Sequence, residues 1–254
     1  MRLYLPLSFL LIACAAPEQA SRSSTYEAES FNRIDIRGAI GDLNIKVGNV
    51  GDLQASLEWR DDTPPEFRTR LIGNTLLVIT SCPARDNACR IDLDVELPEE
   101  ADIDARIEAG DITVTGLRGL IDVATDAGTI RLVETRGAAR ARTGSGDLLL
   151  TSVSSRLDVT ADAGAITGTE VRSPTIKARS YNEPIDLRFA DRPDILEGWT
   201  DNGDVTIALP RGSYDIDANS KRGDVEITEV ANSGEADSIL ILQSVRGNIT
   251  VTGL

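Results

Sequence analysis

Apolar and polar residues alternate with a period of two along most of the chain, and a short turn motif interrupts the alternation at regular intervals. The motif has the form Gly-x-apolar-x-apolar, and x after the glycine is most often Asp. Its copies begin at Gly110, Gly128, Gly146, Gly164, Gly203, Gly223 and Gly247, and one copy without the glycine begins at Glu183. The spacings are 18, 18, 18, 19, 20, 20 and 24 residues. Repeats of this length are typical of solenoid coils and are too short for propeller blades.

The residues on both sides of each turn predict strands. Two and four residues after the turn position, fifteen of the sixteen residues are aliphatic. Seven, five and three residues before it, the residues are apolar and then small, as in Leu157, Val159 and Ala161. The residues between them, such as Asp158 and Lys177, are charged. This alternation predicts two strands per coil, each with one buried face, and equivalent strands stacked about 4.8 Å apart.

The predicted fold class is all-β: a single-stack, β-helix-like β-solenoid of about eight coils of 18–24 residues, formed by residues 101–254, with an N-terminal β cap over residues 26–100. The cap region contains alternating segments without the period, including a predicted hairpin at Gly73-Asn74. Repeat arrays need such caps because an open end exposes the core and unpaired strand edges. The last coil is expected to end the stack at Leu254, without a C-terminal cap.

The first residues are typical of an exported lipoprotein. Residues 1–13 combine a positive start with an apolar run too short to span a bilayer, as a signal peptide does. The sequence Leu11-Ile-Ala-Cys14 resembles the bacterial lipobox, which implies cleavage before Cys14 and acylation of that cysteine. The small polar residues that complete segment 14–25 predict a flexible tether, and Ala15 after the cysteine favours the outer membrane by the same resemblance. The alternative is an ordinary secretory leader with an incidental cysteine.

The other two cysteines, Cys82 and Cys89, have six residues between them, in a chain predicted to be exported to an oxidising compartment. This spacing favours a disulfide that closes a small loop. The alternative is two buried thiols. A tetrahedral metal site would need further thiolate or imidazole ligands, and the sequence has no histidine.

Composition excludes several classes of function. The absence of histidine excludes Ser-His-Asp and Cys-His catalysis. Because 41 acidic residues outnumber 26 basic ones, the net charge of −15 repels phosphate backbones and argues against a nucleic-acid partner. No cofactor is expected.

Three features of the repeat are candidates for binding chemistry. Aspartates after the turn glycines, such as Asp111 and Asp204, would form a carboxylate ladder suited to Ca²⁺, although the same residues are ordinary turn formers. Arg222-Gly-Asp224 spells an integrin-recognition tripeptide, but it lies where the repeat places its turns. Tyr181 and Trp199 occupy outward positions in neighbouring coils and are predicted to form a small ligand platform. The alternative for this pair is two isolated surface aromatics.

The leader, the irregular β start, the segment Asp92-Leu-Asp-Val-Glu-Leu-Pro98 and the Gly-Asp-Ile-x-Val coils together resemble a bacterial family of unknown function described as "putative auto-transporter adhesin, head GIN domain". The resemblance covers about residues 30–254 and implies no functional residues. We therefore expect a lipid-anchored, non-enzymatic, adhesin-like solenoid that presents an acidic surface at the cell envelope and binds a protein or glycan. The alternatives are a carbohydrate-active enzyme with a carboxylate pair on one face, or a periplasmic scaffold or sensor.

Overall fold

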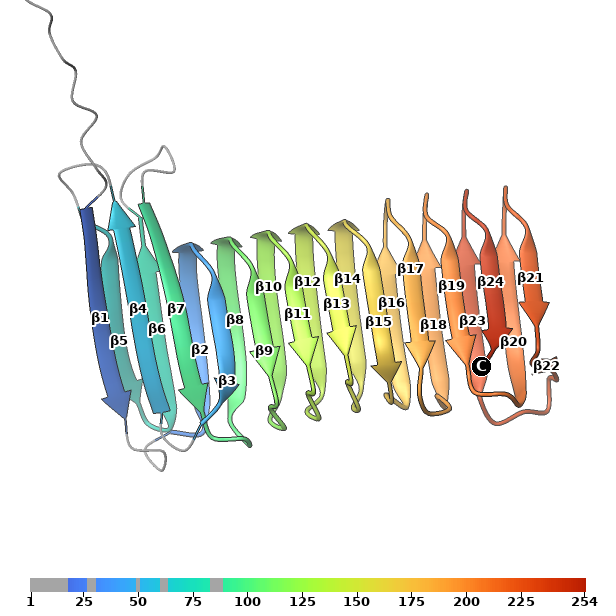
Figure 1. Ribbon diagram of the computed structural model, residues 1–254, viewed down its shortest axis with the longest axis horizontal. Coiled ribbons are helices and arrows are strands. Elements are labelled where there is room, and N and C mark those ends of the chain that lie inside the picture. Colours follow the sequence, from blue (N-terminus) through green and yellow to red (C-terminus); the bar gives the residue numbers. More distant parts are fainter. Residues whose placement is uncertain (1–17, 27–30, 49–50, 60–63, 83–88) are drawn as a thin grey trace, which may run out of the picture.

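The computed structural model describes residues 18–26, 31–48, 51–59, 64–82 and 89–254. The predicted leader (1–13), Cys14 and the beginning of the predicted tether lie outside the described residues. All regular structure is β, in two twelve-stranded sheets that face each other along an elongated rod (Figure 1). The predicted all-β solenoid is therefore confirmed. Among the described residues, no helix has the length and apolar character needed to cross a membrane.

The order of strands in each sheet defines the rod. In sheet A it is β1 (Glu18–Tyr26), β4 (Gly51–Trp59), β7 (Cys89–Leu97), β3 (Leu43–Val47), β9 (Ile112–Thr115), β11 (Ile130–Val133), β13 (Leu148–Thr151), β15 (Ile166–Val171), β17 (Ile185–Phe189), β19 (Val205–Leu209), β24 (Ile249–Gly253) and β21 (Val225–Thr228). In sheet B it is β22 (Ala231–Asn232), β20 (Ser213–Ser220), β23 (Ile239–Ser244), β18 (Ile195–Thr200), β16 (Thr175–Ser180), β14 (Leu157–Ala163), β12 (Ala139–Ser145), β10 (Ile121–Ala127), β8 (Asp102–Ala109), β2 (Arg33–Ile40), β6 (Thr75–Ser81) and β5 (Glu66–Ile72).

Aliphatic side chains from the two sheets meet between them and form the core. Coils inside the stack contribute inward residues at the positions predicted from the alternation, and Ile130, Leu132, Leu148 and Leu157 are at most 1% exposed. In the outermost coil Val225 is exposed, because no further strand pairs beyond β21. Neighbouring coils pair in parallel and in register, for example Ile130 with Leu148. Every coil therefore buries its apolar face only against its neighbours, which is the defining property of a solenoid.

The small residue three positions before each turn has a second role that its size alone does not predict. In most coils it carries a hydroxyl that donates to the turn carbonyl of the adjacent coil. Thr143 Oγ1 donates to the Gly128 oxygen at 2.8 Å, and Ser244 Oγ donates to the Gly203 oxygen at 3.0 Å. Because both side chains are almost completely buried, these hydroxyls satisfy carbonyl groups that water cannot reach.

The solenoid begins earlier than predicted. Strands β2 and β3 pair in parallel with β8 and β9 and form a ninth coil within the region assigned to the cap. This coil carries the turn motif as Gly41-Asp-Leu-Asn-Ile45, which a search limited to residues after Gly110 misses. The predicted boundary at residue 100 is therefore wrong: residues 33–47 belong to the stack of coils.

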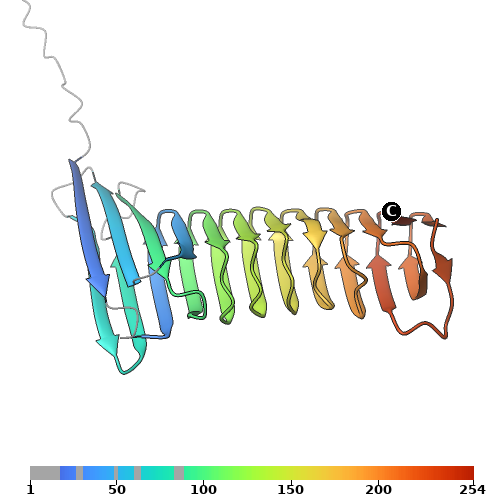
Figure 2. The same ribbon diagram turned by 60° about the horizontal axis from the view of Figure 1, so that its bottom comes forward.

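The N-terminal cap consists of the remaining strands at that end, whose greater length Figure 2 shows. Strands β4 and β7 pair antiparallel, and β5 and β6 form the predicted hairpin. Strand β1 pairs antiparallel with β4, from Glu18 opposite Trp59 to Tyr26 opposite Gly51. The expected tether over 14–25 is therefore wrong from Glu18 onward, because this polar segment forms the outer edge strand of sheet A.

The C-terminal coils stack in a different order from the sequence. Strands β23 and β24, the last in the chain, lie between the coil β18–β19 and the coil β20–β21 (Figure 1). The expectation that the stack ends at Leu254 is therefore wrong. The outermost coil carries outward Asp215, Asp217 and Glu226, whereas the inserted coil carries outward Ile239 and Ile241. Charged side chains protect an exposed edge from pairing with other chains, which favours the observed order.

The predicted disulfide is present in the cap. Cys82 follows β6 of sheet B and Cys89 begins β7 of sheet A, and the Cα atoms are 5.8 Å apart. The bond therefore links the two sheets beside the first coil, because β6 pairs with β2 and β7 pairs with β3. Replacing both cysteines with serine should lower the free energy of unfolding by about 2–3 kcal/mol, because a small loop is no longer closed in the unfolded chain. Urea unfolding without reductant measures this, and equal stability of the two proteins would contradict it.

Candidate functional site

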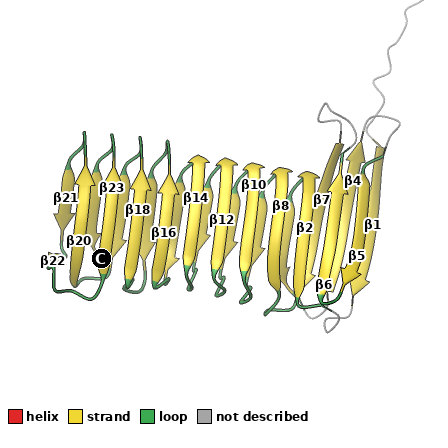
Figure 3. Ribbon diagram, turned by 180° about the vertical axis from the view of Figure 1, so that it is seen from behind, coloured by secondary structure: helices red, strands yellow, loops and turns green. Residues whose placement is uncertain are grey.

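The outer face of sheet B carries the polar side chains that are candidates for binding. Figure 3 shows the strands of this sheet side by side along the rod. Their in-register pairing aligns equivalent outward residues into rows that run along the rod. One row lies four residues before the turn position of each coil. From β12 to β23 it consists of Arg142, Thr160, Arg179, Trp199 and Gln243. We call these five residues the Arg–Trp row.

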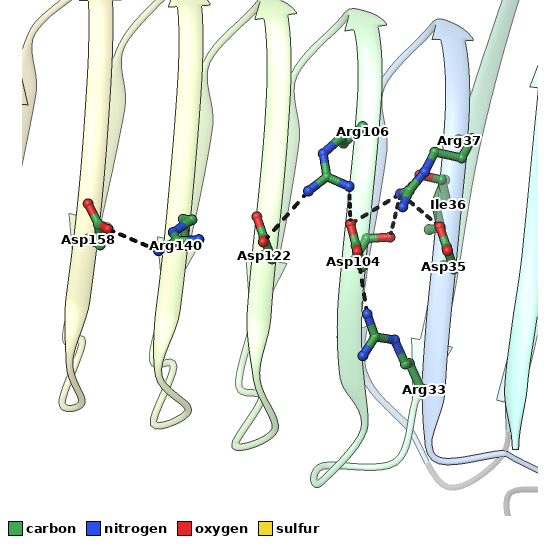
Figure 4. A network of polar contacts seen from close by, with 9 residues as sticks. All are labelled: Arg33, Asp35, Ile36, Arg37, Asp104, Arg106, Asp122, Arg140 and Asp158. Carbon is green, nitrogen blue, oxygen red and sulfur yellow. Dashed lines mark hydrogen bonds and ion pairs between the residues drawn. The ribbon is translucent and has the colours of Figure 1, made fainter.

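At the cap end of the same face, arginine side chains form ion pairs with aspartates (Figure 4). Asp104 on β8 accepts from Arg106 at 2.7 Å and from Arg37 on β2 at 3.1 Å, and Arg33 approaches it at 3.4 Å. Further along, Arg140 on β12 pairs with Asp158 on β14 at 3.4 Å. The contacts of Asp104 with Arg37 and Arg33 on β2, and that of Arg140 with Asp158, join neighbouring strands and therefore favour the observed register.

Two arginines of the Arg–Trp row differ from this pattern. Arg142 and Arg179 are exposed, and neither has an ion pair or a side-chain hydrogen bond within the part of the chain that the structure describes. Their nearest charged neighbours along the strands, Arg140 and Lys177, are paired with Asp158 and Glu197 instead. Both guanidinium groups are therefore free to bind a ligand.

The structure brings Tyr181 and Trp199 together, as the sequence predicts. Their ring centroids are 5.2 Å apart, with the rings nearly perpendicular at 84°. The pair lies in an open hollow of about 580 Å³ on the outer face of sheet B. The residues that line this hollow are Ala178, Arg179, Tyr181, Glu197, Gly198, Trp199, Ile241 and Gln243. Their role in ligand binding stays a prediction.

A second hollow of about 600 Å³ adjoins the first and shares Glu197 with it. Its apolar part includes Leu120, which is 59% exposed, and Ile195, which is 39% exposed. The carboxylates of Asp158 and Glu197 in its wall are ion-paired with Arg140 and Lys177. The two hollows together give sheet B a continuous groove with aromatic, apolar and cationic surfaces.

The turn aspartates form a ladder of hydrogen bonds. Oδ1 of a turn aspartate inside the stack accepts from the backbone N–H of the equivalent turn residue in the neighbouring coil: Asp42 from Asp111 at 2.9 Å, Asp111 from Thr129 at 2.8 Å, and Asp204 from Asn248 at 2.7 Å. This is the turn chemistry that the sequence offered as the alternative to calcium binding. No group of three or more acidic, cysteine or histidine side chains arranged for a metal ion occurs among the described residues.

The Arg222-Gly-Asp224 segment forms such a turn in the outermost coil. The Asp224 N–H donates to Asn248 Oδ1 at 2.9 Å, and the Gly223 N–H donates to Ser220 Oγ at 2.8 Å. The tripeptide therefore follows the bonding pattern of the other turns, and the repeat explains its presence.

The stability that this ladder contributes depends on pH through the carboxyl group of Asp111. Burial alone would raise the pKa of the Asp111 carboxyl, but hydrogen bonds from Arg131 at 2.7 Å and from the Thr129 N–H outweigh burial and lower the pKa below its ordinary value. A carboxyl with a depressed pKa in the folded state stabilises the protein above its unfolded pKa, and this contribution disappears as the pH falls through the folded pKa.

Asp111→Asn should therefore reduce the stability lost on acidification below about pH 4, the ordinary range for an aspartate. Urea unfolding of the two proteins at a series of pH values measures this difference. Asp126→Asn is the matched control, because Asp126 is exposed and takes part in no side-chain hydrogen bond of the ladder. An equal acid dependence in wild type and Asp111→Asn would contradict the prediction.

The sequence analysis singled out the aromatic pair but missed Arg142, Arg179 and Gln243. The signal was present, because each lies four residues before a turn position, as Trp199 does. Aligning the coils on their turns would have placed all four in one row. The sequence does not show which arginines form ion pairs, because this depends on the positions of side chains on neighbouring strands.

Comparisons with known proteins agree with this architecture. The family model described as Toastrack DUF4097 matches residues 90–252. A solved structure titled "putative adhesin" from Bacteroides fragilis is 14% identical, with a TM-score of 0.56, covering 93% of this chain and 97% of that one. One with the same description from Parabacteroides merdae is 11% identical, with a TM-score of 0.46 and coverages of 93% and 96%. At these identities the likeness to the first structure supports the fold alone. No curated protein matches the chain.

Proposed function

The chain belongs to the Toastrack DUF4097 family, and from this premise we propose that it is a lipid-anchored, non-enzymatic binding protein of the bacterial cell envelope, with an adhesin-like role. The observation that carries the proposal is the outer face of sheet B, where arginines without an ion pair among the described residues adjoin the exposed Tyr181 and the half-buried Trp199. A rigid rod of stacked coils holds such side chains at fixed spacings, which suits recognition of an extended partner. The adhesin descriptions of structurally similar proteins agree with this role.

The anchor rests on the sequence around Cys14. The lipobox-like Leu11-Ile-Ala-Cys14 would place a diacylglycerol on the cysteine and a further acyl chain on its amino group. Several acyl chains hold a protein on a membrane stably, whereas one does not. The residue after the cysteine, Ala15, favours the outer membrane, and an adhesin-like role requires the rod to face the exterior.

Cys14→Ala should move the protein from the membrane fraction to the soluble fraction without unfolding it, because the acylated residue is lost while the rod is unchanged. Fractionation of expressing cells and immunoblotting measure this. Cys82→Ala provides a matched control that also removes one cysteine and should stay with the membrane. Retention of Cys14→Ala in the membrane fraction would refute the anchor.

The enzyme hypothesis has less support. A glycosidase of the usual kind needs one carboxyl group that is protonated at working pH and a second carboxylate close to it. The groove on sheet B contains Asp122, Asp158 and Glu197, and each lies within ion-pair distance of a cation: Arg106 at 3.7 Å, Arg140 at 3.4 Å and Lys177 at 2.9 Å. The carboxylates that such a mechanism would use are therefore already engaged with cations of this chain.

A further inference from the structure

We propose that the Arg–Trp row binds a glycan that carries carboxylate groups, with the sugar chain lying along the rod axis. The inference rests on the proposed binding function and names the class of ligand and the residues that take it. It is carried by the spacing of the row, by the pairing state of its arginines and by the contact of Trp199, next to Arg179 in the row, with Tyr181.

The row presents its groups at equal intervals. Arg142, Thr160, Arg179, Trp199 and Gln243 lie on five consecutive strands in register, so neighbouring members are about 4.8 Å apart and the two arginines about 10 Å apart. The Cα atom of a residue on a stacked strand cannot shift along the rod without breaking the parallel pairing. The row is therefore a linear set of side chains on a fixed backbone, and an extended polymer is the ligand that can contact all of them.

The arginines specify the charge of the ligand. A guanidinium group presents a planar fork of donors that matches a carboxylate in a bidentate manner. Other arginines on this face, such as Arg37, Arg106 and Arg140, already contact aspartates. Arg142 and Arg179 have no such partner among the described residues, although the chain as a whole has 41 acidic residues. Their donors are thus available for carboxylates of a ligand.

The aromatic pair specifies the sugar. Trp199 follows Arg179 in the row and contacts Tyr181 at a centroid distance of 5.2 Å, and both line the same hollow. An aromatic ring offers an apolar face to the C–H groups of a pyranose, while hydrogen-bonding groups at its edge engage the hydroxyls. Gln243, which is exposed and adjacent to Trp199, provides both a donor and an acceptor at that edge.

Because the net charge of −15 repels anions, overall charge would not hold an anionic ligand on this protein. Binding must therefore come from the local geometry of the row. This distinguishes the proposal from attachment of any polyanion: an anionic chain without sugar rings would contact the arginines but gain nothing from Trp199.

The test measures binding of full-length protein in detergent to hexamers of galacturonate, mannuronate and glucuronate-containing hyaluronan, by isothermal titration calorimetry. At least one hexamer should bind, and its methyl-esterified form should bind at least about tenfold more weakly, because charge-assisted hydrogen bonds are lost. Arg142→Ala and Arg179→Ala should each weaken binding by about tenfold or more, and Trp199→Ala by about threefold to tenfold. Polyglutamate of similar length should bind more weakly, with no effect of Trp199→Ala.

Arg188→Ala is the matched control, because Arg188 is an exposed arginine on β17 of the opposite sheet and lacks an ion pair among the described residues. It should bind as wild type does. Thermal unfolding of each variant verifies the fold, since all these side chains lie on the surface. Absence of binding to all three hexamers at millimolar concentration, equal binding of the methyl esters, or equal losses in Arg188→Ala and Arg179→Ala would overturn the proposal. Membrane attachment through Cys14 is independent of these outcomes.

Discussion

Gly128→Ala is expected to destabilise the rod by about 4 kcal/mol or more, at the upper end of what single substitutions do. A Cβ atom at Gly128 would lie 1.9 Å from the carbonyl oxygen of Gly110 in the preceding coil, and the Gly128 φ of +150° disfavours any other residue. The obstacle is backbone that is itself held in the stack, so no side-chain rotation relieves it. The coils on both sides would have to separate, which breaks the parallel pairing of several strands.

Urea unfolding monitored by far-ultraviolet circular dichroism measures this effect. Gly73→Ala is the matched control: Gly73 also has a positive φ, +58°, but no atom lies within 4 Å of the added Cβ. That variant should lose only about 1 kcal/mol, the conformational cost of a left-handed residue. If both variants lost the same amount, the close stacking of the turns would not be the reason for the glycine.

Removing residues 233–254 is expected to unfold the C-terminal end of the rod rather than shorten it by one layer. The deletion removes β23 and β24, which lie between two other coils. It also removes Leu240, Leu242, Ile249 and Val251, all of them 0% exposed. Burial of such side chains contributes about 1.5–3 kcal/mol each, so the loss is comparable with the entire stability of a typical domain.

Amide hydrogen exchange resolves where the deletion acts. Residues 213–228 should lose their protection in the truncated chain, because their neighbours in both sheets are gone. Removing residues 18–26 is the control, since β1 is an edge strand and contacts only β4. That deletion should leave exchange in the coils unchanged. Full protection of 213–228 after deletion of 233–254 would contradict the inserted position of the last coil.

Most of the fold can be predicted from the sequence because the coils repeat the same turn motif and the same alternation of apolar and polar residues. The turn glycine and the alternating aliphatic residues are set by close backbone contact and by burial, and these causes act within one coil and its neighbours. Residues such as Ile130 and Leu132 therefore fall inward as predicted, and Tyr181 and Trp199 meet because they occupy outward positions in adjacent coils.

Apart from the polar segment that forms β1, the errors concern the order in which coils stack. Parallel pairing stabilises any two neighbouring coils of the same shape, so the repeat in the sequence does not determine which coils are neighbours. The coil at Gly41 and the inserted coil at Gly247 both satisfy the repeat, but their neighbours in space are distant in the chain. The 24-residue spacing before Gly247, the largest of the series, was the only local sign that the chain returns at this point.

Digestion of intact cells by proteinase K tests the central claim, that a lipid-anchored rod presents its binding face at the cell envelope for recognition of an external partner. Wild type, Cys14→Ala and lysed wild-type cells are compared by immunoblot, with a periplasmic protein as the integrity control. The account predicts that wild type is digested on intact cells as it is after lysis, while the integrity control persists. Protection of wild type until lysis would contradict it, and would place the rod in the periplasm as a scaffold or sensor.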